Sequence, residues 1–100
     1  MDDGNPSLPA GTNRIALNGE YDLTRKEELA ALFSELSSNT GAVVDLSQVT
    51  YVDSTFLHVL ASLYFRLKPH GVTLTGANTS IRRLLSIVKF DGLFHIADPL

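Results

Sequence analysis

The fold is decided by residues 42–55, which read AVVDLSQVTYVDST. Residues 42–46 form a continuous aliphatic and β-branched run, which is typical of a strand covered on both faces in a parallel sheet. After a loop at residues 47–49, the segment ends in the polar residues 53–55, and apolar residues then recur at helical spacing. The segment therefore predicts a central parallel strand followed by a helix that begins at residues 53–55.

The stretch before this segment predicts one strand and one helix. Residues 14–17 alternate in the manner of a short strand, and the turn pair Asn18 and Gly19 ends it. A capping box at residues 24–27 predicts a helix start, and the polar cluster at residues 37–41 ends that helix. Its apolar residues lie on one stripe, so one helix face packs on the sheet.

The stretch after it predicts two further strands with a helix between them. The central helix ends near Lys68, because Pro69 disfavours the α conformation before it. Residues 72–76 predict a strand, residues 78–80 cap a third helix, and residues 93–97 predict an edge strand. The order β-α-β-α-β-α-β predicts an α/β domain with a mostly parallel, four- to five-stranded sheet and about three main helices.

Length and chain ends predict one small domain. The 100 residues have room for a single core. Residues 1–13 are rich in acids, prolines and glycines, so we expect a flexible N-terminal tail before a domain at residues 14–100. The start lacks the features of a secretory signal, and no apolar stretch approaches the roughly 20 residues of a membrane span. We therefore expect a cytoplasmic protein with no membrane insertion.

Composition argues against several kinds of chemistry. With 8 Lys and Arg against 11 Asp and Glu, the net charge is −3, which disfavours direct binding of nucleic acid. The chain has no cysteine, its three histidines stand apart, and no nucleotide, zinc-protease or hydrolase motif occurs, so we expect no cofactor and no metal. Ser54 and His58 are four residues apart, but a nucleophile also needs an oriented base and an oxyanion hole. We expect no enzymatic activity.

The polar residues 53–55 admit two interpretations. One of them caps the helix, and capping alone explains such residues before an apolar helical run. Alternatively, a hydroxyl at a helix start is a good phosphate acceptor, because free amides and the helix dipole stabilise a dianion by roughly 0.3–2 kcal/mol. A partner pressed against that surface would then lose affinity, because opposing the new charge costs several kcal/mol.

Three motifs in order resemble a known family. Residues 44–55, the earlier residues 17–22 and the later residues 81–85 leading to 90–94 are similar to a STAS domain of the bacterial anti-sigma factor antagonist (anti-anti-sigma factor) type. The resemblance implies a small α/β domain whose helix start docks onto an anti-sigma factor of the serine/threonine kinase type and so frees a sigma factor. The kinase ends the interaction by phosphorylating the domain, and a phosphatase is a further expected partner.

The resemblance also assigns roles to single residues. Thr55 falls on the phosphoacceptor position, and Ser54 is the alternative acceptor. Phe56 stands where the family commonly has a small residue, and a bulky side chain there is expected to reshape the docking surface or anchor a partner. Asp22 matches the loop acid of the family's G-E-x-D motif, with an ordinary turn role as its alternative. The expected partner-contacting residues are Asp22, Asp53, Ser54, Thr55, Phe56 and His58.

Two other functions remain open. The same fold serves as an accessory subunit of a membrane transporter for lipids or anions, in which the helix edge docks on an ATPase subunit without phosphorylation. A small nucleotide- or ligand-binding domain is the other alternative. It requires a pocket lined by converging polar groups around Asp22, Asp53 and Ser54.

Overall fold

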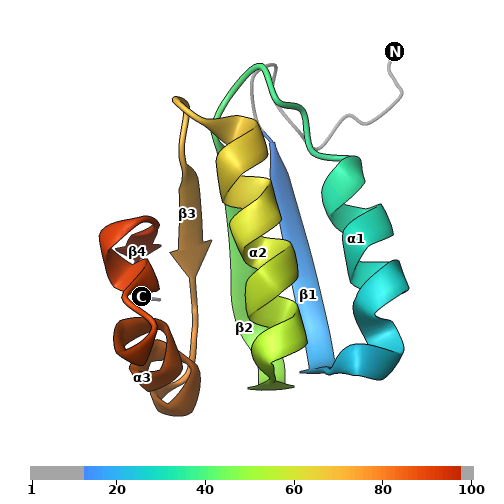
Figure 1. Ribbon diagram of the computed structural model, residues 1–100, viewed down its shortest axis with the longest axis vertical. Helices are drawn as coiled ribbons and strands as arrows, with labels where there is room; N and C mark the ends of the chain where they lie inside the picture. Colours follow the sequence, from blue (N-terminus) through green and yellow to red (C-terminus); the bar gives the residue numbers. More distant parts are fainter. Residues whose placement is uncertain (1–12, 98–100) are drawn as a thin grey trace.

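A parallel β-sheet carries the helices of this chain (Figure 1). The computed structural model describes residues 13–97. Within them, the strands pair in the order β1-β2-β3-β4, and each pairing is parallel. The predicted α/β architecture is confirmed. The elements are β1 (Arg14–Tyr21), η1 (Leu23–Arg25), α1 (Lys26–Ser34), β2 (Ala42–Val52), α2 (Ser54–Leu67), β3 (Val72–Thr75), α3 (Thr79–Ile87), η2 (Phe90–Gly92) and β4 (His95–Ala97).

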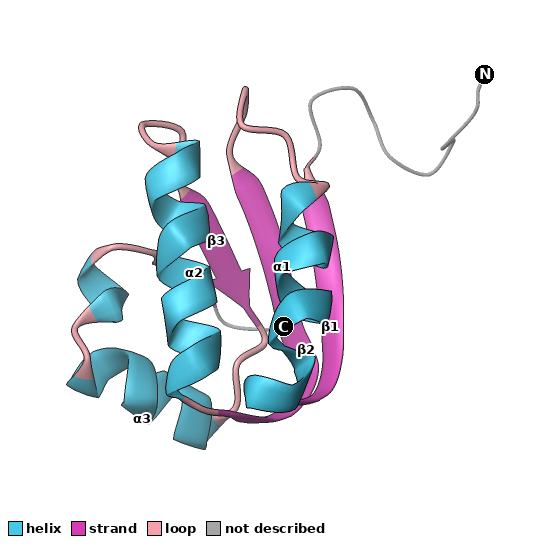
Figure 2. Ribbon diagram, turned by 45° about the vertical axis from the view of Figure 1, so that its right-hand side comes forward, coloured by secondary structure: helices cyan, strands magenta, loops and turns pink. Residues whose placement is uncertain are grey.

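The helices pack on one face of the sheet. Figures 1 and 2 show α1 and α2 side by side over the strands, with α3 toward the β3 side. Right-handed crossovers that always step in the same direction along the sheet place their helices on one face. In β2, Ala42, Val44 and Leu46 are buried, whereas Val43 and Asp45 are half-buried. The prediction of a central parallel strand is confirmed, because β2 pairs with β1 on one side and β3 on the other, but the expected cover on both of its faces is wrong for the described residues.

The first strand is longer than its pattern predicts. It continues through Asn18 and Gly19, so these residues do not end it. Gly19 has φ +84° and lies between two shifts of the β1–β2 register, so its positive φ serves a bulge in the strand and not a hairpin-type turn. Pairing along both strands, with Gly19 opposite Val49 and Tyr21 opposite Val52, also draws the predicted loop at residues 47–49 into β2.

The predicted capping box at residues 24–27 is wrong. The carboxylate of Asp22 accepts the backbone N–H of Thr24 and caps η1, and α1 begins only at Lys26. The last strand is also shorter than predicted, because the turn η2 at Phe90–Gly92 holds the chain out of the sheet until His95.

Two other predicted boundaries are confirmed. The side chain of Asn78 accepts the N–H of Ile81 and caps α3, and α2 ends at Leu67, before Lys68. The predicted tail at residues 1–13 lies outside the described residues apart from Asn13. The side-chain amide of Asn13 donates a hydrogen bond to the carbonyl of Ser37 at 2.7 Å, and the backbone N–H of Ser37 donates to the side-chain oxygen of Asn13 at 2.9 Å.

Two glycines with positive φ provide a test of the packing at the carboxyl end of β3. A Cβ added to Gly76 would lie 2.7–2.9 Å from atoms of Ser47, whereas a Cβ added to Gly71 would meet nothing within 4 Å. We expect Gly71→Ala to cost about 1–2 kcal/mol through its left-handed backbone. Gly76→Ala should cost about 1–3 kcal/mol more through the added overlap. Urea unfolding of both variants measures the difference, and equal costs would contradict the close approach.

Candidate functional site at the start of helix α2

Asp53 caps helix α2 with its own carboxylate. Its Oδ1 accepts the backbone N–H groups of Thr55 at 2.9 Å and of Phe56 at 3.3 Å. The backbone N–H of Asp53 donates to the carbonyl of Tyr21 at 3.2 Å, which ties the helix start to the end of β1. The capping role expected among residues 53–55 therefore belongs to Asp53.

The two hydroxyl residues that follow are free of that capping duty. Ser54 is exposed and Thr55 is half-buried. Neither hydroxyl has a hydrogen-bond partner within residues 13–97. Both lie in the first turn of α2, where the positive end of the helix dipole favours an added anion. Within the described residues, neither hydroxyl therefore has a structural hydrogen bond to maintain.

Asp22 lies at the equivalent point of the neighbouring strand. Tyr21 and Val52 are partners in the β1–β2 register, so Asp22 and Asp53 leave the sheet side by side. Their backbone angles match, with φ −123° for both and ψ −169° and −170°. The Thr24 hydroxyl and N–H bonds lower the pKa of Asp22 below its ordinary value. Asp22 thus lies at the expected edge and also has its alternative role, as a turn cap.

The expectation that Phe56 contacts a partner is wrong. Its side chain is only 1% exposed, and its ring packs 6.0 Å from the ring of Tyr21. The guanidinium of Arg25 lies over the same Tyr21 ring, 4.0 Å from its centroid. A bulky residue at position 56 therefore anchors the first turn of α2 to the core instead of reshaping the outer surface.

His58 is exposed and shares a groove with Ser54. The groove has a volume of about 540 Å³ and runs between α2 and the segment that joins α3 to η2. No hydrogen bond joins the Ser54 hydroxyl and the His58 imidazole in the described part of the chain. The pair is not arranged as a nucleophile and base.

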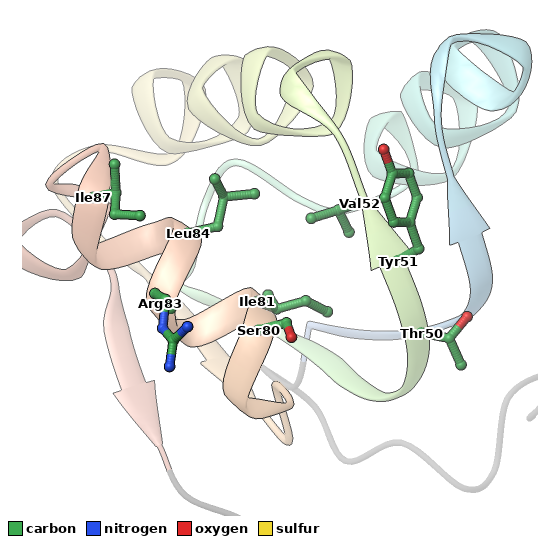
Figure 3. Close-up of a pocket in the computed structure, with 8 residues that line it drawn as sticks. All are labelled: Thr50, Tyr51, Val52, Ser80, Ile81, Arg83, Leu84 and Ile87. Carbon is green, nitrogen blue, oxygen red and sulfur yellow. The ribbon is translucent and has the colours of Figure 1, made fainter.

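A second hollow lies beside the end of β2, just before α2 begins (Figure 3). It has a volume of about 270 Å³ and is bounded by residues 50–52 of β2 and by α3. Figure 3 shows Val52 and Leu84 facing each other across it. Ser54 lines the groove, whereas Val52, two residues earlier, lines the second hollow; α3 borders the second hollow, and the segment after α3 borders the groove.

Within residues 13–97, no group of three or more His, Cys, Asp or Glu side chains is placed to hold a metal ion. The groove that contains Ser54 is lined mainly by apolar side chains and includes neither Asp22 nor Asp53. The converging polar pocket that a nucleotide-binding domain requires does not form there. In the same described stretch, no helix has the length and apolar character needed to cross a bilayer.

The chain matches the sequence model of a known family. The sequence model of the family described as "Mlab, STAS domain" matches residues 6–96. The chain belongs to the STAS domain family. This confirms the resemblance drawn from residues 17–22, 44–55 and 81–94.

Solved structures support the same fold for this STAS domain. An anti-sigma factor antagonist from Mycobacterium paratuberculosis has a TM-score of 0.82 at 24% identity, covering 93% of this chain and 82% of its own. The anti-sigma factor antagonist SpoIIAA in its unphosphorylated form has a TM-score of 0.69 at 17% identity, with coverages of 93% and 84%. The STAS domain of a SulP transporter from Vibrio cholerae has a TM-score of 0.66 at 21% identity, with coverages of 93% and 77%. At these identities the likeness shows a shared fold.

The outer wall of the groove is not among the predicted site residues. Phe65 is 65% exposed and lies off the buried stripe of α2, and Val88 faces it from the end of α3. The position of Phe65 in the sequence was a usable signal, because an aromatic residue off the apolar stripe of a helix does not face the core.

Substitution at Asp53 tests its capping role. Asp53→Ala should lower the free energy of unfolding by about 1 kcal/mol, because two N–H groups lose their acceptor. Asp53→Asn keeps an acceptor oxygen and should stay near the wild-type value. Urea unfolding measures both, with Asp91→Ala as a control for loss of an exposed carboxylate. A cost for Asp53→Ala no larger than that of the control would contradict the cap.

Acid should weaken the neighbouring cap at Asp22. The folded-state pKa of Asp22 is lowered, so its contribution to stability is present above the ordinary pKa of an aspartate and is lost as the pH falls toward the folded value. Between about pH 6 and pH 3, the free energy of unfolding should therefore fall less in Asp22→Asn than in the wild type. Urea unfolding at several pH values tests this, and parallel pH profiles would exclude the linkage.

Proposed function

We propose that this STAS domain is an anti-sigma factor antagonist that is switched off by phosphorylation at the start of α2. One observation carries the proposal: Asp53 performs the capping, which leaves the hydroxyls of Ser54 and Thr55 without an intramolecular role in the described structure. The domain acts by binding and catalyses no reaction itself. Its proposed partner is a kinase-type anti-sigma factor in the cytoplasm, and a phosphatase would restore the unmodified form.

Simple energetics make the helix start a suitable switch. A phosphate on Thr55 or Ser54 adds a charge of about −1.5 to −2, which the first turn of a helix tolerates or favours. The same charge within a docked surface costs several kcal/mol, and each 1.4 kcal/mol is a tenfold loss of affinity. The carboxylates of Asp22 and Asp53 already lie at the same edge. A basic group of the partner would therefore meet negative charge there even before phosphorylation. The added phosphate therefore lowers the affinity by placing a charge against the apolar contacts beside it.

A transporter role is the second candidate. The fold likeness to the STAS domain of a SulP transporter and the family description both favour it. In that role the same helix edge docks on an ATPase subunit of the transporter, and the hydroxyls need no modification. If the protein that this domain binds phosphorylates the start of α2, the antagonist role is favoured. If the start of α2 is never phosphorylated, the accessory-subunit role is favoured.

Phosphorylation is tested directly by co-expression with a candidate anti-sigma factor kinase. We expect intact-mass measurement to show one added phosphate on the wild type, and fragmentation to place it on Thr55. Thr55→Ala should lose it, whereas Ser54→Ala should keep it. Loss in Ser54→Ala alone would move the acceptor to Ser54, and an unmodified wild type would count against the antagonist role.

Charge at the acceptor should weaken partner binding. Thr55→Asp is expected to lower affinity for the anti-sigma factor by about tenfold or more in a calorimetric titration. Thr79→Asp is the matched control, because Thr79 is an exposed hydroxyl residue in the first turn of another helix, α3, capped there by Asn78. Equal losses in both variants would show a general effect of charge and contradict the switch.

A further inference from the structure

A long apolar groove extends along α2 from the proposed switch. Leu57, Ala61 and Phe65 line it at intervals of four residues, so they share one face of the helix, and Ser54 lies at the start of that face. Val88 and Phe90 form the opposite wall. From Ser54 to Phe65 the groove follows the helix for about 16 Å, which is the length of three turns.

The outer part of the groove exposes apolar surface that the core does not need. Phe65 is 65% exposed and Val88 is 37% exposed. Next to Val88, Ile87 is 68% exposed and borders the second hollow. A contiguous apolar surface of this kind on a small domain marks an interaction site.

A positive charge lies at the end of the groove away from Ser54. The ammonium group of Lys68 lies 5.5 Å from the centroid of the Phe65 ring, whereas the chain on either side of Phe90 carries one charge of each sign, at Lys89 and Asp91. None of the residues that line the groove is acidic. An occupant with carboxylates at that end therefore gains complementary charge.

We propose that this groove binds an amphipathic helix of the partner protein, with its apolar face against Phe65 and Val88 and acidic residues toward Lys68. The proposal rests on the proposed function and deepens it by stating what the partner presents. A groove about as long as three helical turns, lined at helical spacing, fits a helix laid alongside α2. A phosphate at the helix start would stand at one end of that bound helix.

Two other occupants fit less well. A membrane surface is flat and would meet the exposed rim but not the floor of a concave groove. In a symmetric pair of copies, the same patch meets itself, and its lining has no acidic residue to pair with Lys68 of the other copy. Charge and shape together favour an acidic amphipathic helix.

A synthetic helical peptide of about 14 residues, with leucines on one face and glutamates at one end, provides the probe. Titration of the isotope-labelled protein should shift the amide resonances of α2 and of residues 87–90. Phe65→Ser should weaken binding about tenfold, whereas Leu93→Ser should not. Leu93 is the matched control because it is 41% exposed and lines a different hollow, with Gly41 and His70. Lys68→Glu should weaken this peptide and strengthen a lysine-ended version.

Several outcomes would overturn the proposal. It fails if a scrambled peptide of the same composition binds equally, if Phe65→Ser and Leu93→Ser behave alike, or if Lys68→Glu leaves the charge preference unchanged. Self-association lost in Phe65→Ser, or binding to phosphatidylglycerol vesicles without peptide binding, would assign the groove to another occupant. Peptide binding that survives while Thr55→Asp leaves anti-sigma factor binding intact would reject the switch but keep the groove.

Discussion

The hydrogen bonds of Asp53 are the constraint on which the site depends. Its N–H binds the end of β1, and its carboxylate binds the first two amides that follow Ser54. One residue thus joins the sheet to the helix and fixes the direction in which α2 leaves. Because the cap uses a carboxylate, a hydroxyl beside it can change its charge without removing the cap. Separation of these two roles is what makes modification compatible with folding.

Beneath this cap, aromatic packing holds the helix start in place. The ring of Phe56 packs on Tyr21, and Arg25 covers Tyr21 while donating to the carbonyls of Asn18 and Glu20 at 2.9 Å. Arg25 is also paired with Glu28 at 2.7 Å. The bulged end of β1 is therefore fixed by one cation. Rigid support of this kind means that a phosphate added above would act on a partner more than on the shape of the domain.

Much of the fold could be predicted from local patterns, and the exceptions have physical causes. Asn78, Lys68 and the apolar stripe of α2 marked boundaries that depend on nearby residues alone. By contrast, Gly19 looks like a turn residue until β2 pairs across it, and Thr24 looks like a cap until Asp22 takes that role. These choices are made by strand pairing and by competition between caps, neither of which a local pattern contains.

The site shows the same division. Asp53, Ser54 and Thr55 were found because polar residues before an apolar helix are a local signal, and Asp22 joined them through strand register. Phe56 was misjudged because an aromatic residue in a first helical turn faces either a partner or the core, and only Tyr21 decides which. The groove wall at Val88 comes from the segment that follows α3, and no spacing within α2 could predict it.

The polarity of α2 explains why the proposed switch lies at the first turn of the helix, where the groove starts, and not at the Phe65 end of the groove. Its first turn lies at the positive end of the helix dipole, which favours a phosphate dianion, whereas its last turn lies at the negative end, which favours a cation such as Lys68. A phosphate near Phe65 would meet the negative end of the dipole and destabilise the helix. A phosphate at Ser54 or Thr55 leaves α2 intact and meets only what is docked beside it. The helix dipole thus favours the proposed negative switch at the first turn and Lys68 at the last, and the acidic end of a partner helix would be attracted by Lys68 and not by the dipole.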